Sequence, residues 1–309
     1  MLDVRRMKVL REVAIRGSFS AAAEALNFTQ SAISQHVAAL EREAGARLVE
    51  RGARGVRLTE AGQALVGHAD VILARIACAE EELAAIAGLR GGRLRLICFQ
   101  SAGATLGARA IACFHELHPD VELSMVEAEP EEASERLRSG GSDLALVYDH
   151  KGAPPSLDAE LELTHLTDDR YDALLPANHR LAGRRRLSIA DLAGEPWVAS
   201  TSNCGCRLII ERVCQEAGFE PNVAFEADET LAAQALVAAG VGVTILPRLA
   251  LTTVHPGVVA RSLTHAPVRS VWAAQPRDAF RSAASEAMLQ ILEDVAEEFK
   301  ESPLELAAS

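Results

Sequence analysis

The pattern of apolar and polar positions is most regular between residues 17 and 62, where two short helical runs lie close together. The apolar faces of these runs are Phe19, Ala22, Ala23 and Leu26 in the first, and Ile33, Val37 and Leu40 in the second. Ser20 is a candidate N-cap for the first helix, and Asn27 can adopt the left-handed conformation that ends it. We therefore predict two tightly joined helices, the arrangement of a helix-turn-helix.

The second of these helices has a polar face opposite its apolar one. Its short side chains can donate and accept hydrogen bonds at base edges in the major groove of duplex DNA. The predicted DNA contacts on this helix are Thr29, Gln30, Ser31, Ser34 and Gln35, with His36 on the same face. Gln30, Ser34 and Gln35 are expected at base edges, and Ser31 at a thymine methyl group.

A short hairpin is predicted directly after the two helices. Residues 48–51 and 56–58 have the character of strands, and the turn between them is rich in glycine. Arg51 and Arg54 lie at its tip, where they would contact the phosphate backbone or enter a minor groove. The segment therefore predicts a winged helix-turn-helix, which a first helix over residues 2–15 would brace.

Residues 59–88 form one long helical pattern with a stripe along one side. The stripe consists of Ala61, Leu65, His68, Ile72, Ile76, Ala79, Leu83 and Ile86. Such a helix extends about 45 Å at its rise per residue, so the neighbouring chain is too short to cover the stripe. We predict a dimerisation helix, with a helix packed only on its own domain as the alternative.

From Gly92 onward, strands and helices alternate, which predicts an α/β domain. Buried strands are expected at residues 94–99, 121–125 and 143–148, with helices between them. A second unit of the same kind covers about residues 163–268, and an amphipathic helix follows it. We predict two α/β lobes joined by crossing segments near His165 and Ala266.

Two stretches are expected to bind a small molecule between these lobes. Each stretch follows a strand and leads into a helix, and the free N–H groups of a helix N-terminus suit a small anion. The candidate effector contacts are Gln100, Ser101, Thr105, Thr201, Ser202 and Asn203. The same serine and threonine residues could instead be ordinary helix caps, which leaves the ligand role open.

The net charge of −12 fits a DNA-binding protein only when it is divided along the chain. Residues 1–62 contain ten Lys and Arg against seven Asp and Glu, which leaves 21 against 36, a net charge of −15, for the rest. The basic excess therefore lies where DNA would bind, and the acidic remainder would repel phosphate.

Two further features predict a cytoplasmic protein. The first thirteen residues are charged throughout and contain no apolar stretch of secretory length. The longest apolar run, residues 231–246, is interrupted by Gly240 and Gly242 and is shorter than a membrane span. The six cysteines are therefore expected to stay reduced.

The motifs of the first 62 residues resemble those of the LysR-type transcriptional regulators of bacteria. The resemblance is carried by residues 18–26 (SFSAAAEAL), 29–34 (TQSAIS), 40–41 (LE) and 58–62 (LTEAG). Ser31 stands where many members of the family have proline, and Val49 replaces the usual aromatic residue. The change at Ser31 alters the group that would touch a thymine methyl.

The resemblance implies a DNA-binding domain at residues 1–58, a linker helix at 59–88 and an effector-binding domain at 93–302. The effector domain would have a periplasmic-binding-protein architecture, with lobe I at about 93–163 and 268–300 and lobe II at about 164–267. Its effector is often a carboxylate in this family. The family also implies a homodimer that assembles into a homotetramer, a pseudo-palindromic promoter site, and contact with RNA polymerase if the protein is an activator.

Three alternative functions are weighed against this one. Cys204, Cys206 and Cys214 could form a redox switch, although a bridge across one residue would be strained. A solute-binding protein would fit the two lobes but not the N-terminal motifs. An enzyme is disfavoured because no HExxH, GxSxG or phosphate-loop motif occurs, so we predict no catalytic residue, metal ligand or cofactor.

Overall fold

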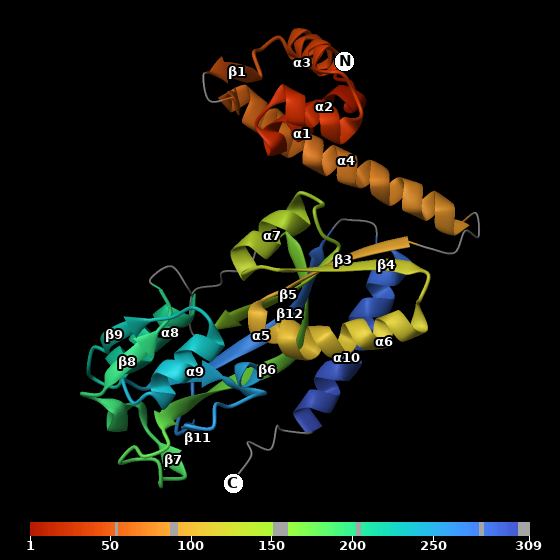
Figure 1. Cartoon of the computed structure of the whole chain (residues 1–309). Helices are drawn as coiled ribbons and strands as arrows, with labels where there is room; N and C mark the ends of the chain where they lie inside the picture. The colour runs from red at the N-terminus through yellow and green to blue at the C-terminus, as the bar shows by residue number, and fades with distance from the viewer. Residues whose placement is uncertain (53–54, 87–91, 151–159, 202–204, 278–280, 302–309) are drawn as a thin grey trace.

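The computed structural model describes residues 1–52, 55–86, 92–150, 160–201, 205–277 and 281–301 of the chain. Figure 1 shows a small helical head, one long helix that leaves it, and a larger α/β body. The predicted architecture, a winged helix-turn-helix followed by a long helix and a two-lobed α/β domain, is confirmed.

The head is a three-helix unit with a two-stranded hairpin. Its elements are α1 (Val4–Arg16), α2 (Phe19–Leu26), α3 (Gln30–Ala44), β1 (Val49–Gly52) and β2 (Gly55–Leu58). Apolar side chains from all three helices form one core, with Leu10, Ile33 and Leu40 completely buried. Burial of this kind is the main favourable term in the stability of such a small unit.

Helix boundaries in the head follow from individual caps. Asn27 has φ 55°, so the predicted left-handed end of α2 is confirmed. The prediction of Ser20 as N-cap is wrong, because Ser18 accepts from the backbone N–H of Ala21 at 3.1 Å and Ser20 lies inside the helix. Both positions hold serine, but only Ser18 has the extended backbone that a cap requires.

The motif at residues 58–62 connects the wing to the long helix. Thr59 donates from its hydroxyl to the Arg47 carbonyl at 2.7 Å and accepts from the Gly62 N–H at 3.0 Å. A Cβ atom at Gly62 would lie 2.1 Å from the Leu48 carbonyl oxygen, so only glycine fits there. These contacts hold the start of the helix against the base of the wing.

The long helix α4 (Glu60–Ile86) joins the head to the body. Its first half packs Leu65, Val66 and Ala69 into the head core. Further along, Ile72, Ile76 and Leu83 of the apolar stripe are exposed, so the described part of this chain does not bury these three side chains. No helix among the described residues is both long and apolar enough to cross a membrane.

The first lobe of the body surrounds one half of the main sheet. Its elements are β3 (Gly92–Cys98), α5 (Gln100–Ala102), η1 (Gly103–Gly107), α6 (Ala108–Leu117), β4 (Val121–Glu127), α7 (Pro130–Arg138), β5 (Leu144–His150), β12 (Val268–Pro276) and α10 (Ala283–Glu301). The helices α6 and α10 cover one face of this half, and α7 covers the other (Figure 1).

The second lobe continues from the first through one long strand. Its elements are β6 (Leu161–Pro176), β7 (Arg186–Leu187), η2 (Ile189–Leu192), β8 (Pro196–Ala199), α8 (Gly205–Glu216), β9 (Asn222–Glu226), α9 (Thr230–Ala238), β10 (Thr244–Pro247), η3 (Arg248–Leu251) and β11 (Val258–Leu263). The eight-stranded sheet has the order β4-β3-β5-β12-β6-β11-β7, with β10 also paired to β6. The two lobes therefore share a sheet, and β6 belongs to both.

A buried ion pair lies where β6 and β12 pass between the lobes. The Arg269 guanidinium is 2.9 Å from the Asp169 carboxylate, and their side chains are only 3 % and 0 % exposed. Arg269 also donates to the Ser101 hydroxyl at 2.6 Å, and Asp169 accepts from the Leu249 N–H at 3.2 Å. One pair of charges thus connects both crossing strands with a segment from each lobe.

We expect Asp169→Asn to destabilise the body by about 3–5 kcal/mol, because the buried Arg269 charge would lose its counter-charge. Urea unfolding followed by circular dichroism measures this loss. The matched control is Glu298→Gln, which breaks the exposed pair with Arg109 and should cost less than about 1 kcal/mol. Equal losses in the two variants would contradict the role assigned to the buried pair.

Candidate DNA-reading surface and effector site

The first two turns of α3 present polar side chains to solvent. Gln30, Ser31 and Gln35 are exposed, and Ser34 is half-buried. The opposite face, with Ile33 and Val37, is buried in the head core, so the helix cannot turn its polar face inward. This exposed, uncharged face has the chemistry of a base-reading surface.

The residues just before α3 shape the start of that surface. Thr29 is the N-cap, and its hydroxyl accepts from the Ala32 N–H at 3.2 Å. Phe28 is exposed, and its ring stacks on His36 with centroids 5.6 Å apart. Thr29 therefore has a structural task beside its predicted DNA contact.

The wing is an antiparallel hairpin in which Arg51 pairs with Val56. Arg54 lies outside the described residues, and Arg51 is described only as part of the β1 backbone. The exposed Arg57, on β2, is a basic residue that sequence reasoning missed. Its place in the alternation of the strand, next to the half-buried Val56, is the signal that could have identified it.

A small cavity of about 70 Å³ lies between the two lobes. Lobe I contributes Gln100, Ser101, Glu129 and Tyr148 to its wall, lobe II contributes Asp228 and Thr230 among others, and Tyr171 and Arg269 come from the crossing strands. The Gln100 amide crosses the cleft, because it donates to Glu229 at 2.5 Å and accepts from the Thr230 hydroxyl at 3.3 Å. The lobes are therefore joined by direct hydrogen bonds, and a metabolite needs more room than this cavity has.

The predicted effector contacts are only partly brought together. Gln100 and Ser101 line the cavity. Thr105 is buried behind them and is not part of the cavity wall, and its hydroxyl donates to the Ser101 carbonyl at 2.6 Å within the helix. Ser202 and Asn203 lie outside the described residues.

Thr201 already holds a carboxylate. Its N–H donates to Asp228 at 2.8 Å and its hydroxyl donates to the same group at 3.1 Å. Sequence reasoning predicted donors for an anion at this position, and here a side chain of the protein satisfies them. Asp228 was not predicted, since it follows a strand 27 residues away with no motif to connect the two.

The cavity has more acidic groups than the sequence indicated. The Glu129 carboxylate accepts from the Tyr148 hydroxyl at 2.7 Å, and Asp228 lies on the opposite lobe. The guanidinium of Arg269 lies over the rings of Phe99 and Tyr148, at 4.7 and 4.9 Å, but Asp169 compensates its charge. A buried arginine in a strand was the only sequence signal for this centre.

The cysteines give little support to a redox switch. Burial raises the pKa of the Cys214 thiol to about 12, which suppresses the reactive thiolate. Burial, with a smaller effect from the Glu127 charge, raises the pKa of Cys98 to about 12 as well. Cys206 lines the cleft cavity, and Cys204 lies outside the described residues.

Comparison with known proteins connects both surfaces to one family. Residues 4–63 match the profile of the bacterial regulatory helix-turn-helix protein of the lysR family, and residues 87–297 match the LysR substrate binding domain. The chain is 31% identical over 299 residues to the probable HTH-type transcriptional regulator LrrA of Synechococcus elongatus, covering 97% of this chain and 99% of LrrA. It is 32% identical over 272 residues to the HTH-type transcriptional regulator ShiR of Corynebacterium glutamicum, covering 87% and 88% of the two chains.

A solved structure supports the same fold. Full-length CbnR complexed with its target DNA superposes with a TM-score of 0.70 at 20% identity, covering 95% of this chain and all of that one. At this identity the likeness concerns the arrangement of the chain alone.

His150 makes stability depend on pH. Its Nε2 lies 2.8 Å from the Tyr171 hydroxyl, and burial, followed by the charges of Arg269 and Arg212, lowers its pKa from 6.5 to about 4. The unfolded chain therefore binds this proton at a higher pH than the folded one, so acid favours unfolding. We expect the free energy of unfolding to fall as the pH drops from 6.5 to about 4.

As the pH drops from 6.5 to about 4, the free energy of unfolding of the His150→Gln variant should fall by about 2 kcal/mol less than that of the parent chain. Urea titrations at a series of pH values measure the difference, and the other titrating groups cancel between the two chains. Parallel pH profiles would contradict the assignment to His150.

Proposed function

The chain belongs to the LysR family of transcriptional regulators, and from this premise we propose how its surfaces read DNA and respond to an effector. It is a DNA-binding regulator and neither an enzyme nor a solute-binding protein. The family prediction made from residues 18–62 is therefore confirmed.

The head reads DNA through the start of α3. Gln30, Ser34 and Gln35 contact base edges, Ser31 meets a thymine methyl, and Thr29 contacts the duplex beside them. Arg51 and Arg54 of the wing contact the backbone or minor groove. The observation that carries this proposal is the exposed polar face of α3, which is held outward by its buried opposite face.

Two copies of the chain pair through α4. Ile72, Ile76 and Leu83 are exposed at helical spacing, and a second copy of the helix would remove them from water. The domains act as residues 1–58 for DNA, 59–88 for pairing and 93–302 for the effector. A dimer of heads places two α3 helices on a pseudo-palindromic site.

The dimers assemble further into a tetramer through the body. Exposed apolar side chains lie on two helices, α6 and α8, and on two edge strands, β4 and β9. They are Leu117, Met125, Val126, Leu208 and Phe225. Edge strands with apolar side chains are surfaces that a second copy can cover. The protein acts in the cytoplasm, and contacts RNA polymerase there if it is an activator.

The effector is a small carboxylate or other anion that enters the cleft between the lobes. Support comes from Thr201, whose N–H and hydroxyl already hold the Asp228 carboxylate, and from Ser101 on the facing lobe. An anionic effector would displace Asp228 and break the Gln100 contacts that cross the cleft. Opening of the lobes about β6 and β12 would provide the missing volume.

The variant Gln30→Ala should lose discrimination at one base pair, by about 1–3 kcal/mol, with other positions of the site unchanged. The paired variant Arg54→Ala should weaken all sequences alike and flatten the salt dependence by about one counterion. Mobility-shift titrations on single-base variants of the promoter site, at several salt concentrations, separate the two effects.

A change of sequence preference in Arg54→Ala, or a uniform loss in Gln30→Ala, would contradict the division of labour between α3 and the wing.

The variant Asp228→Asn tests the anion proposal. Asparagine keeps an acceptor for Thr201 but removes the competing charge, so binding of benzoate and other small carboxylates should strengthen about tenfold. Thermal-shift titration at constant ionic strength measures the affinity for these carboxylates. Glu298→Gln is the matched control, because it also removes an exposed carboxylate but lies outside the cleft cavity. Two results would favour a cationic effector at Glu129 and Asp228. One is weaker carboxylate binding to Asp228→Asn than to the parent chain, and the other is that the parent chain binds the cation benzylammonium more tightly than benzoate.

A further inference from the structure

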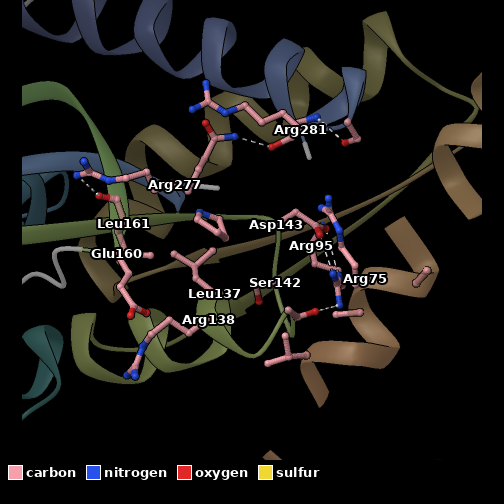
Figure 2. Close-up of a pocket in the computed structure, with 18 residues that line it drawn as sticks. Arg75, Arg95, Leu137, Arg138, Ser142, Asp143, Glu160, Leu161, Arg277 and Arg281 are labelled. Atoms are coloured by element: carbon pink, nitrogen blue, oxygen red, sulfur yellow. Dashed lines mark hydrogen bonds and ion pairs between the residues drawn. The ribbon is translucent and has the colours of Figure 1, made fainter. Parts of the chain in front are cut away.

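A second, larger cavity lies between α4 and lobe I. Its volume is about 540 Å³, within the size range of metabolite sites. Figure 2 shows side chains from α4, β3, α7, the start of β6 and the start of α10 gathered around it. Its residues are distinct from those of the cleft cavity. Val71, Leu137, Leu161 and Pro276 form apolar parts of its wall.

The charged side chains of this cavity are mainly basic. Five arginines line it against two carboxylates: Arg75, Arg95, Arg138, Arg277 and Arg281, with Asp143 and Glu160. The chain beyond residue 62 has a net charge of −15, so this is a local reversal of sign. Such a concentration of cations in a concave site raises the local concentration of small anions.

Two of the five arginines are already held by carboxylates. Arg95 forms a forked pair with Asp143, at 2.6 and 3.1 Å, and also donates to the Gly140 carbonyl at 2.7 Å. Arg281 pairs with Glu162. These contacts fix the walls of the cavity and leave little of either charge for a ligand.

Two others have no carboxylate partner among the described residues. Arg75 is exposed on α4 and has no hydrogen bond or ion pair with another described residue. The Arg277 guanidinium donates to the Leu161 carbonyl at 3.3 Å. Figure 2 shows these two side chains on opposite sides of the cavity. Guanidinium groups bind carboxylate and phosphate through paired hydrogen bonds, so each side can hold one anionic group.

A serine hydroxyl adds a hydrogen-bonding group to the wall. Ser142 lines the cavity and is 5 % exposed. A serine hydroxyl can donate one hydrogen bond and accept others, which suits a ligand oxygen.

We infer that this cavity binds an organic dianion with an apolar centre, whose two anionic groups are held by Arg75 and by Arg277. The apolar wall accepts the centre of the ligand, and Ser142 donates to one of its oxygens. A molecule with a single anionic group would satisfy only one arginine.

Because the cavity lies between α4 and lobe I, such a ligand would hold α4 against lobe I. At this point Gly140 approaches so closely that a Cβ atom there would lie 2.0 Å from the Ala74 Cβ, so α4 already contacts lobe I. At about 100° per residue, Ile72, Ile76 and Leu83 lie on average about 100° around the helix from Val71 and Arg75. The dianion would therefore bind without competing with a partner helix, and it would hold the helix that carries the head.

The experiment is calorimetric titration of the full chain with succinate, adipate and suberate at constant ionic strength, with hexanoate as the monoanion control. At least one dicarboxylate should bind more tightly than hexanoate. Arg75→Gln and Arg277→Gln should each weaken it about tenfold, the effect of losing one charge-assisted contact. Arg185→Gln, another exposed arginine without a partner among the described residues, should leave it unchanged.

Three results would overturn the inference: no dicarboxylate binds more tightly than hexanoate, Arg185→Gln weakens binding as much as Arg75→Gln, or neither cavity variant weakens it. Tighter dicarboxylate binding in Asp228→Asn with no loss in Arg75→Gln would place the ligand in the cleft between the lobes. Because Arg75 and Arg277 are remote from Ser101 and Asp228, failure here leaves the cleft proposal standing.

Discussion

The ion pair between Arg269 and Asp169 is the contact on which the arrangement of the two lobes depends. Both charges are almost completely buried, and the desolvation of such a pair is so costly that apolar residues would often serve stability as well. Apolar residues, however, do not form contacts that fix the orientation of one strand against another. Arg269 must meet Asp169, the Ser101 hydroxyl and the faces of two aromatic rings together, which fixes β12 against β6 and the end of β3.

The same pair connects the crossing strands with the cleft cavity. Ser101 lies in the cavity wall and accepts a hydrogen bond from Arg269, and Asp169 accepts one from Leu249 in η3 of lobe II. A ligand that takes the Ser101 hydroxyl would change the environment of a charge that both lobes share. The connection between the lobes is polar and directional rather than a layer of interchangeable apolar contacts.

The sequence predicted the elements whose signal is local. The spacing of apolar residues identified the three head helices and α4, and Asn27 marked a helix end because few other residues adopt its backbone conformation. Local signals failed where the deciding contact is remote. Nothing in residues 163–176 indicates that β6 runs through both lobes, and β11 is recognisable only by its pairing with β6.

The functional sites follow the same rule. The place of Gln100 and Ser101 at the cleft could be predicted because they follow a strand and begin a helix. Thr105 fits the same pattern, but its hydroxyl donates to the Ser101 carbonyl. Asp228 reaches Thr201 from another loop, and Arg75 meets the wall that contains Arg277 only after the chain has passed through both lobes. Side chains so far apart in sequence are brought together by the sheet and not by any periodicity.

The distribution of charge explains why basic groups in the head and in the body can serve different partners. The head has a small basic excess on an exposed surface, where duplex DNA can reach it. The arginines of the second cavity lie in a concave site between α4 and lobe I, within a body whose net charge repels a polyanion. A DNA duplex is excluded by its size and by long-range repulsion. A small dianion has much less charge to be repelled and would contact two guanidinium groups. Because α4 forms one wall of the cavity and also carries the head, the proposed ligand would act on the element that connects the body with the head.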